Sequence, residues 1–125
     1  MTTPSGHTSA ISAKKVIDTP VKDTQGNRIG EVEDIVLDKM TNNIKFAIVS
    51  FGGFLGVGEK YHPLPWSVLD YDPEENAYTV TVTKEQLQAA PADSIEELIK
   101  DDGNLVRDRT YDYYNAPRYW EGYKN

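Results

Sequence analysis

The stretch from residue 44 to residue 71, IKFAIVSFGGFLGVGEKYHPLPWSVLDY, limits the possible folds more than any other part of the chain. Residues 44–51 place apolar side chains on both alternating faces of a β-strand, so we expect both faces to be covered. The glycines at 52, 53, 56 and 58 then permit tight or left-handed backbone that other residues resist. The pattern predicts a central, doubly covered strand followed by a glycine-rich loop.

Two apolar residues, Phe54 and Leu55, lie inside that loop, where polar residues are usual. They have two possible roles. They can fold back and close one end of the domain, or they can contact a partner protein. The sequence leaves both roles open.

The flanking segments predict further strands and a few short helices. Residues 13–17 and 21–22 have the pattern of short strand pieces. Residues 29–40 have the pattern of a long strand whose second half, where both faces become apolar, either contains a bulge or is covered on both sides. Residues 78–83 alternate strictly, and Thr83 with Gln86 forms a capping-box pattern for a helix over 84–90. About six β segments with Gly, Asn and Pro turns favour a small barrel or sandwich, with helical pieces outside it.

Composition excludes several classes of protein. The 125 residues carry a net charge of −7, which argues against a protein that binds a nucleic-acid backbone. The absence of cysteine excludes disulfides and thiolate chemistry. The sequence has no apolar run long enough to span a membrane, and its start lacks the apolar run of a signal peptide. We therefore expect a single bacterial-type domain located in the cytoplasm.

Few residues have the spacing of a catalytic or metal-binding site. Asp34 and Asp38 could form a carboxylate pair on one strand face, but a barrel contact and a turn-capping aspartate are the simpler interpretation. The acidic residues within 70–75 surround a turn and do not match a calcium-binding loop. His62 has no sequence neighbour suited to acid–base catalysis with it. The sequence favours a protein without enzymatic activity and predicts neither a cofactor nor a metal ion.

The last segment, residues 104–125, is rich in aromatic residues beside arginines. Such pairs can stack on nucleic-acid bases, but the negative net charge disfavours phosphate contact, so we expect no nucleic-acid partner. Tyr and Trp are also preferred in protein interfaces, which predicts an arm packed on its own barrel or on a second subunit. The candidate interface residues are Phe54, Leu55, Trp66, Tyr111, Tyr114, Tyr119 and Trp120.

Three segments together resemble the PRC-barrel domain family. They are GNRIGEVEDIVLD (26–38), FAIVSFGGFLGVGEKYHPLPWSVLDYD (46–72) and YTVTVTKEQLQAAP (78–91). The ending YDYYNAPRYW (111–120) is similar to that of stand-alone bacterial members. The resemblance implies a mainly β fold: a small antiparallel PRC-type β-barrel of about six strands with short C-terminal helices. The expected organisation is a tail over 1–10, the barrel over 11–92 and a helical, aromatic extension over 93–125.

The same resemblance implies a function in protein interaction or assembly. The family includes the cytoplasmic domain of the photosynthetic reaction-centre H subunit and the C-terminal domain of the ribosome-maturation factor RimM. We expect a non-enzymatic interaction module that forms a homodimer and binds a protein partner that the sequence does not identify. The alternatives are a ribosome- or RNA-processing assembly factor like the RimM barrel, and a photosynthetic reaction-centre-associated protein like the H subunit.

Overall fold

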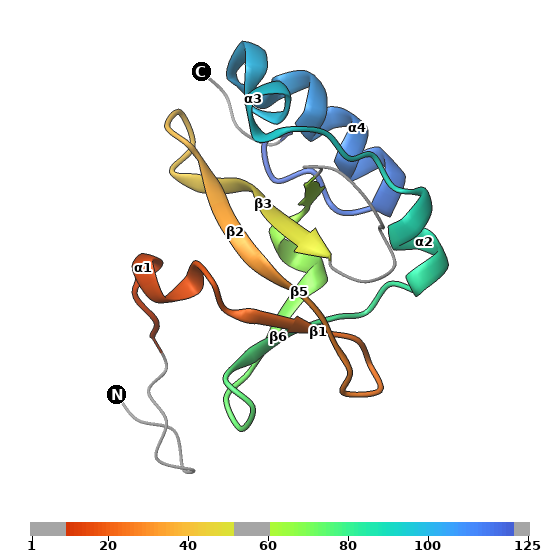
Figure 1. Cartoon of the computed structure of the whole chain (residues 1–125). Coiled ribbons are helices and arrows are strands. Elements are labelled where there is room, and N and C mark those ends of the chain that lie inside the picture. The colour runs from red at the N-terminus through yellow and green to blue at the C-terminus, as the bar shows by residue number, and fades with distance from the viewer. Residues whose placement is uncertain (1–9, 52–60, 122–125) are drawn as a thin grey trace.

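The computed structural model describes residues 10–51 and 61–121, and these form a curled six-stranded sheet with helices packed beside it (Figure 1). The elements in chain order are α1 (Ala13–Val16), β1 (Pro20–Lys22), β2 (Arg28–Asp38), β3 (Asn43–Phe51), β4 (His62–Leu64), the 3-10 turn η1 (Trp66–Val68), β5 (Leu69–Asp72), β6 (Ala77–Val80), α2 (Lys84–Ala89), α3 (Ile95–Leu98), the 3-10 turn η2 (Lys100–Gly103) and α4 (Asn104–Tyr114). The predicted fold class is therefore confirmed.

The sheet has the strand order β4-β3-β2-β1-β6-β5 and curls into a half-barrel. Most neighbouring strands are antiparallel, as predicted, but β1 and β6 run parallel, with Val21 opposite Tyr78. The sheet is therefore mixed. The parallel pair arises because the chain segment after β5 reverses at a turn and brings β6 to the free edge of β1.

The long hairpin β2–β3 is the centre of the sheet. Its register runs from Gly30 opposite Phe51 to Asp38 opposite Asn43. The register shifts between Val32 and Asp34, where Glu33 is the extra residue of β2, and again between Val36 and Leu37, where Lys45 is the extra residue of β3. Because bulges increase the local twist, these two shifts help the hairpin to curl.

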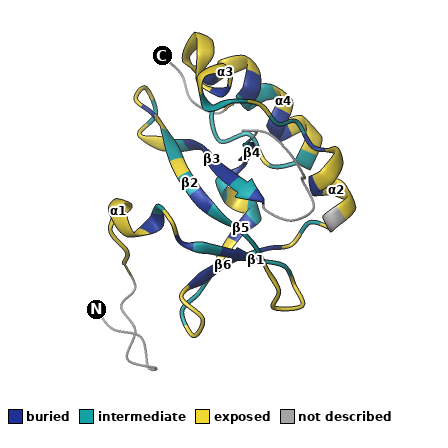
Figure 2. Ribbon diagram, viewed as in Figure 1, coloured by how far each residue is buried: buried dark blue, intermediate teal, exposed yellow. Residues whose placement is uncertain are grey.

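Two apolar clusters lie on opposite faces of β3, which Figure 2 shows buried along its length. Ala47, Val49 and Phe51 belong to the larger cluster inside the curled sheet. Phe46 and Ile48 belong to a smaller cluster together with Leu98 of α3 and Val106 of α4. Since side chains alternate along a strand, this arrangement confirms the prediction of a central strand covered on both faces.

The helices follow local sequence signals. Thr83 and Gln86 form the predicted capping box at the start of α2. α3 is short, and the chain then passes through three consecutive left-handed residues, Asp101, Asp102 and Gly103, before α4. The buried ammonium of Lys45 donates to the Asp102 carbonyl at 2.8 Å and to Asn104 Oδ1 at 2.9 Å, which fixes this junction against β3.

The prediction of a strand over residues 13–17 is wrong, because this segment forms the short helix α1. Ala13, Lys14 and Lys15 are all good helix formers, and their propensity outweighs the contribution of Val16. The helical path ends at Ile17, whose backbone is extended, and Asp18 then adopts a left-handed conformation before the chain enters β1.

Candidate functional site

Residues 116–121 form a C-terminal arm that folds back along α4. The helix ends at Asn115, whose left-handed backbone lets the Ala116 N–H donate to the Tyr111 carbonyl at 3.0 Å. Pro117 cannot continue a helix, so the chain turns here. The arm therefore packs on its own chain, which is one of the two arrangements expected from the sequence.

An aromatic cluster joins this arm to α4. The ring centroid of Trp120 lies 4.9 Å from that of Tyr111 and 5.0 Å from that of Tyr119, both in edge-to-face geometry. The guanidinium of Arg107 lies 3.9 Å from the Trp120 ring centroid, and that of Arg118 lies 5.6 Å from it. These contacts combine aromatic packing with cation–π attraction, and together they hold the arm on the helix.

A hydrogen bond links the arm to the β2–β3 turn. The Tyr119 hydroxyl donates to Asp38 Oδ2 at 2.7 Å, across 81 positions of the sequence. The other carboxylate oxygen, Asp38 Oδ1, accepts from the backbone N–H groups of Met40 and Thr41. Asp38 is thus the turn-capping aspartate that the sequence predicted, and it also anchors the arm.

The ionisation of both partners favours this bond near neutral pH. Burial would raise the pKa of Asp38, but hydrogen bonds from Tyr119, Met40 and Thr41 outweigh it and hold that pKa below its ordinary value. Burial, followed by the bond to Asp38, raises the pKa of Tyr119 well above its ordinary value. The stabilisation from Asp38 is therefore present above about pH 4 and is lost as the pH falls through the lowered pKa.

The variant Tyr119→Phe tests this anchor. Removing the hydroxyl leaves Asp38 with one hydrogen-bond partner fewer. We therefore expect the free energy of unfolding, measured by urea denaturation, to fall by about 1–2 kcal/mol. Tyr113→Phe is the matched control, because the Tyr113 hydroxyl donates to the Gln86 carbonyl at an exposed position and should contribute less. Equal losses in the two variants would contradict a special role for the Tyr119–Asp38 bond.

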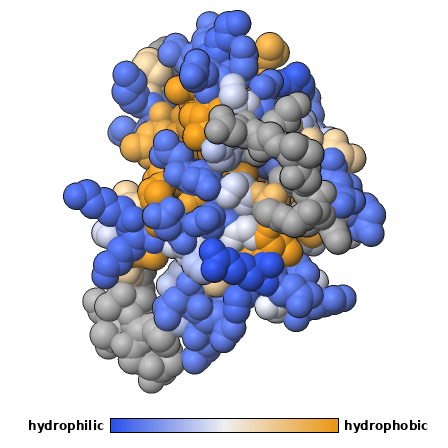
Figure 3. Space-filling model, viewed as in Figure 1, coloured by the Kyte–Doolittle hydropathy of each residue, from blue (hydrophilic) through white to orange (hydrophobic). Residues whose placement is uncertain are grey.

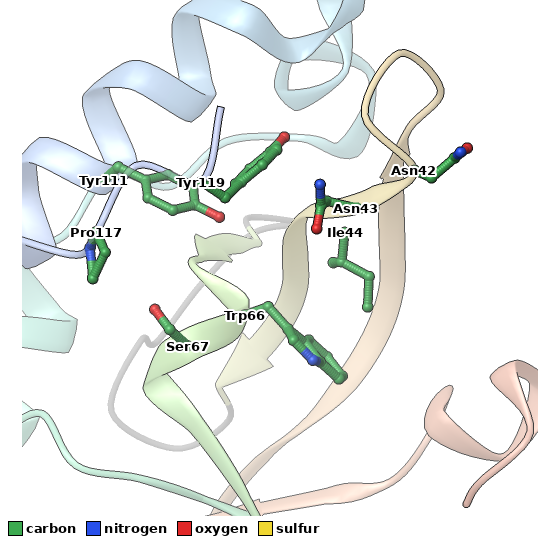
Figure 4. A pocket seen from close by; sticks show the side chains of 8 residues that line it. All are labelled: Asn42, Asn43, Ile44, Trp66, Ser67, Tyr111, Pro117 and Tyr119. Atoms are coloured by element: carbon green, nitrogen blue, oxygen red, sulfur yellow. The ribbon is translucent and has the colours of Figure 1, made fainter. Parts of the chain in front are cut away.

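A hollow of about 430 Å³ opens beside the arm (Figure 4). One wall comes from the start of β3, a second from η1, and a third from α4 and the arm. The residues that line it are Asn42, Asn43, Ile44, Trp66, Ser67, Tyr111, Pro117 and Tyr119. None of these side chains is charged, so the hollow combines aromatic surface with amide and hydroxyl groups. That composition suits contact with a neutral protein surface.

Contacts inside the chain fix the orientation of the rings around this hollow. The Tyr111 hydroxyl donates to the Lys45 carbonyl at 2.9 Å, and burial raises the pKa of Tyr111 to about 12. The Trp66 ring packs edge-to-face against Tyr78, with centroids 5.4 Å apart. Because these side chains are held by the fold, the hollow is a preformed surface.

His62 lies apart from the hollow and inside the core. It is 1% exposed, and its ring packs against Phe51 with centroids 5.3 Å apart. Both ring nitrogens are buried and have no hydrogen-bond partner among the described residues. Burial lowers the pKa of His62, so the imidazole is neutral near pH 7.

The structure places the residues predicted for the interface in three ways. Phe54 and Leu55 lie outside the described residues. Tyr111 is buried but lines the hollow, whereas Tyr114 is half-buried with its hydroxyl enclosed and packs α4 against the core. Trp66, Tyr119 and Trp120 are half-buried; the first two line the hollow, and Trp120 is packed beside Arg107.

Sequence reasoning did not include the polar part of the hollow. Asn42, Asn43 and Ser67 line it, but in sequence they look like ordinary turn residues. The only signals in the sequence that could have indicated them are that Ser67 follows Trp66 and that Asn42 and Asn43 lie at the start of the central strand. The anchor between Tyr119 and Asp38 was likewise not predicted.

Two classes of site do not occur in the described part of the chain. No three acidic or histidine side chains in residues 10–51 and 61–121 come close enough together to hold a metal ion. None of the helices over these residues combines the length and the apolar character needed to cross a membrane.

Comparison with known proteins agrees with the fold. The model of the PRC-barrel domain family matches residues 9–87, which is more than half of the chain. The chain belongs to the PRC-barrel domain family. The matched region covers all six strands of the sheet and reaches into α2, whereas α3, α4 and the arm lie beyond it. A search of curated proteins found no match.

Proposed function

We propose that this chain is a non-enzymatic protein-interaction and assembly module that works as a homodimer and receives another protein in the hollow beside the C-terminal arm. The observation that carries the proposal is the lining of the hollow: uncharged, aromatic and amide-bearing, with the rings of Trp66, Tyr111 and Tyr119 around it. Rigid aromatic side chains give large contact area with little loss of conformational entropy, so they suit protein recognition.

The surroundings of His62 support a role without catalysis. A general acid or base must reach the substrate proton at hydrogen-bond distance. His62 is the one histidine among the described residues, and it is buried with its ring against Phe51. The two described carboxylates with a lowered pKa already accept hydrogen bonds inside the chain: Asp38 from its turn and from Tyr119, and Asp23 from Asn27 and Gln25. These side chains are therefore buried or already hydrogen-bonded within the chain, which argues against their acting as a general acid or base.

Affinity capture followed by mass spectrometry tests the use of the hollow. Ser67 is exposed and lines the hollow, so Ser67→Arg fills it without touching the core. Thr81→Arg adds the same charge at another exposed position and is the matched control. We expect Ser67→Arg to reduce capture of the specific partner by about tenfold or more, and Thr81→Arg to leave it unchanged.

The captured proteins also separate the alternatives. Ribosomal proteins would favour an assembly role like that of the RimM barrel, and reaction-centre subunits a role like that of the H subunit. Full retention of every captured protein by Ser67→Arg would contradict the proposed use of the hollow.

A further inference from the structure

The edge of β2 that faces away from β3 makes its last backbone hydrogen bonds to the preceding part of the chain at Val32. The Val32 N–H donates to the Thr19 carbonyl at 3.0 Å, and the Val32 carbonyl accepts from the Asp18 N–H at 2.7 Å. Beyond this point, residues 33–38 pair only with β3 among the described residues. The upper half of the longest strand therefore has one open edge, visible beside the hairpin in Figure 1.

A side chain covers the open edge at one position. The Ile35 N–H donates to Asp34 Oδ1 at 2.8 Å. Because this amide bonds to a carboxylate instead of to β3, it faces the open edge. Native proteins often place charged groups at strand edges to limit pairing with other chains, and Asp34 does so here.

Apolar side chains accompany this edge. Leu37 is 62% exposed, Met40 at the adjoining turn is 68% exposed, and Ile35 is half-buried. Figure 3 shows hydrophobic surface gathered over the upper part of the β2–β3 hairpin. An open strand edge next to exposed apolar side chains is a surface that gains stability when another strand covers it.

We propose that a second copy of this chain pairs with residues 33–37 as an antiparallel strand, with Ile35 on the two-fold axis. In an antiparallel pair, directly opposed residues whose amides face each other exchange two backbone hydrogen bonds, and Ile35 would do so with Ile35 of the second copy. In this register, Asp34 of one copy lies opposite Val36 of the other, and Glu33 of one copy lies opposite Leu37 of the other. No carboxylate then directly faces another, so the edge is complementary to itself.

Asp34 restrains this association in two ways. Its carboxylate must leave the Ile35 N–H before that amide can bond to the second copy. Its charge also adds to the repulsion between two chains that each carry −7. Salt screens repulsion between exposed charges, so association along this edge strengthens as the salt concentration rises. A basic partner strand would show the opposite salt dependence.

This proposal rests on the homodimer of the proposed function and says where the two copies meet. Sedimentation velocity of the whole chain over a range of concentrations, at low and at high salt, measures the dimer. We expect Leu37→Glu to weaken dimerisation by about tenfold or more, because it places a carboxylate directly opposite Glu33 of the second copy. Leu105→Glu makes the same substitution at another exposed position, 69% exposed on α4, and should leave the dimer unchanged.

A variant with the opposite expected effect keeps the test decisive. Asp34→Ala frees the Ile35 amide and removes a negative charge, so it should strengthen dimerisation several-fold. In the dimer, the Ile35 amide should exchange its hydrogen more slowly as protein concentration increases. Circular dichroism checks that each variant keeps its fold.

The outcomes separate this proposal from the proposed function. A dimer that withstands Leu37→Glu keeps the homodimer and overturns the β2 edge as its interface. A chain that stays monomeric at high salt, even as Asp34→Ala, overturns both the edge and the homodimer. A dimer that weakens with added salt also overturns the edge. Binding of a partner in the hollow is decided separately by capture with Ser67→Arg.

Discussion

Replacing Gly30 with alanine is expected to prevent normal pairing of β2 with β3. A Cβ atom at this position would lie 1.9 Å from the carbonyl oxygen of Ser50 and 2.9 Å from its carbonyl carbon. Both are backbone atoms of the central strand, so no change of side-chain rotamer can relieve the overlap. The hairpin would have to shift, and β1 with it, since Val21 pairs with Gly30 on the other side.

We expect Gly30→Ala to lower the free energy of unfolding by about 3 kcal/mol or more, measured by urea denaturation. Gly26→Ala is the matched control. Gly26 has a positive φ of 87°, but nothing lies within 4 Å of an added Cβ, so backbone strain alone should cost about 1 kcal/mol. Similar losses at both positions would show that the overlap with Ser50 is relieved in some other way.

Truncation of Phe46 should have the second large effect. Phe46 is 0% exposed and belongs to the cluster that joins β3 to α3 and α4. Its ring also lies against Gly103, within 3.2 Å of where a Cβ on that glycine would be. Removing a buried aromatic ring leaves a cavity, so we expect Phe46→Ala to cost about 3–5 kcal/mol of stability.

This loss should affect the hollow more than the inner core. Tyr111 and the arm depend on α4, and α4 depends on the cluster around Phe46. We expect Phe46→Ala to weaken the near-ultraviolet signal of the packed tyrosines and tryptophans before the sheet unfolds. Leu105→Ala removes an apolar side chain from the exposed face of the same helix and is the control. Retention of the full near-ultraviolet signal by Phe46→Ala would contradict this dependence.

Local patterns in the sequence predicted much of the fold. The central strand was predicted from apolar residues on both faces, and its two faces contact two different clusters. The start of α2 was predicted from Thr83 and Gln86, whose capping box depends only on neighbours in the chain. These features follow from short-range periodicity and hydrogen bonding, which sequence alone contains.

Features that depend on tertiary contacts were missed. Ile99 would lie on the same face as Ile95 and Leu98 if α3 continued, but it is 47% exposed because the chain leaves the helical path there. The parallel pairing of β1 with β6 was also not predicted, because antiparallel pairing is the default for strands joined by short turns. Neither the exposure of Ile99 nor the parallel pairing can be predicted from the residues next to it in the sequence.

The candidate site could be predicted only in its aromatic part. Trp66, Tyr111 and Tyr119 stood out because tyrosine and tryptophan are preferred in protein interfaces. Asn43 and Ser67 join them only because β3, η1 and α4 meet in the fold. The open edge of β2 depends on where β1 stops pairing, and the sequence of β2 does not contain that information.

The parallel pair of β1 and β6 has a consequence for the order in which the protein folds. Val21 and Tyr78 are far apart in the chain, so joining them closes a long loop at a substantial entropic cost. The β2–β3 hairpin closes only the short turn around Met40 and Asn42, and we expect it to form first. During synthesis, β1 must therefore stay without its second neighbour until Tyr78 has left the ribosome, and the half-barrel assumes its final curvature only at that last step.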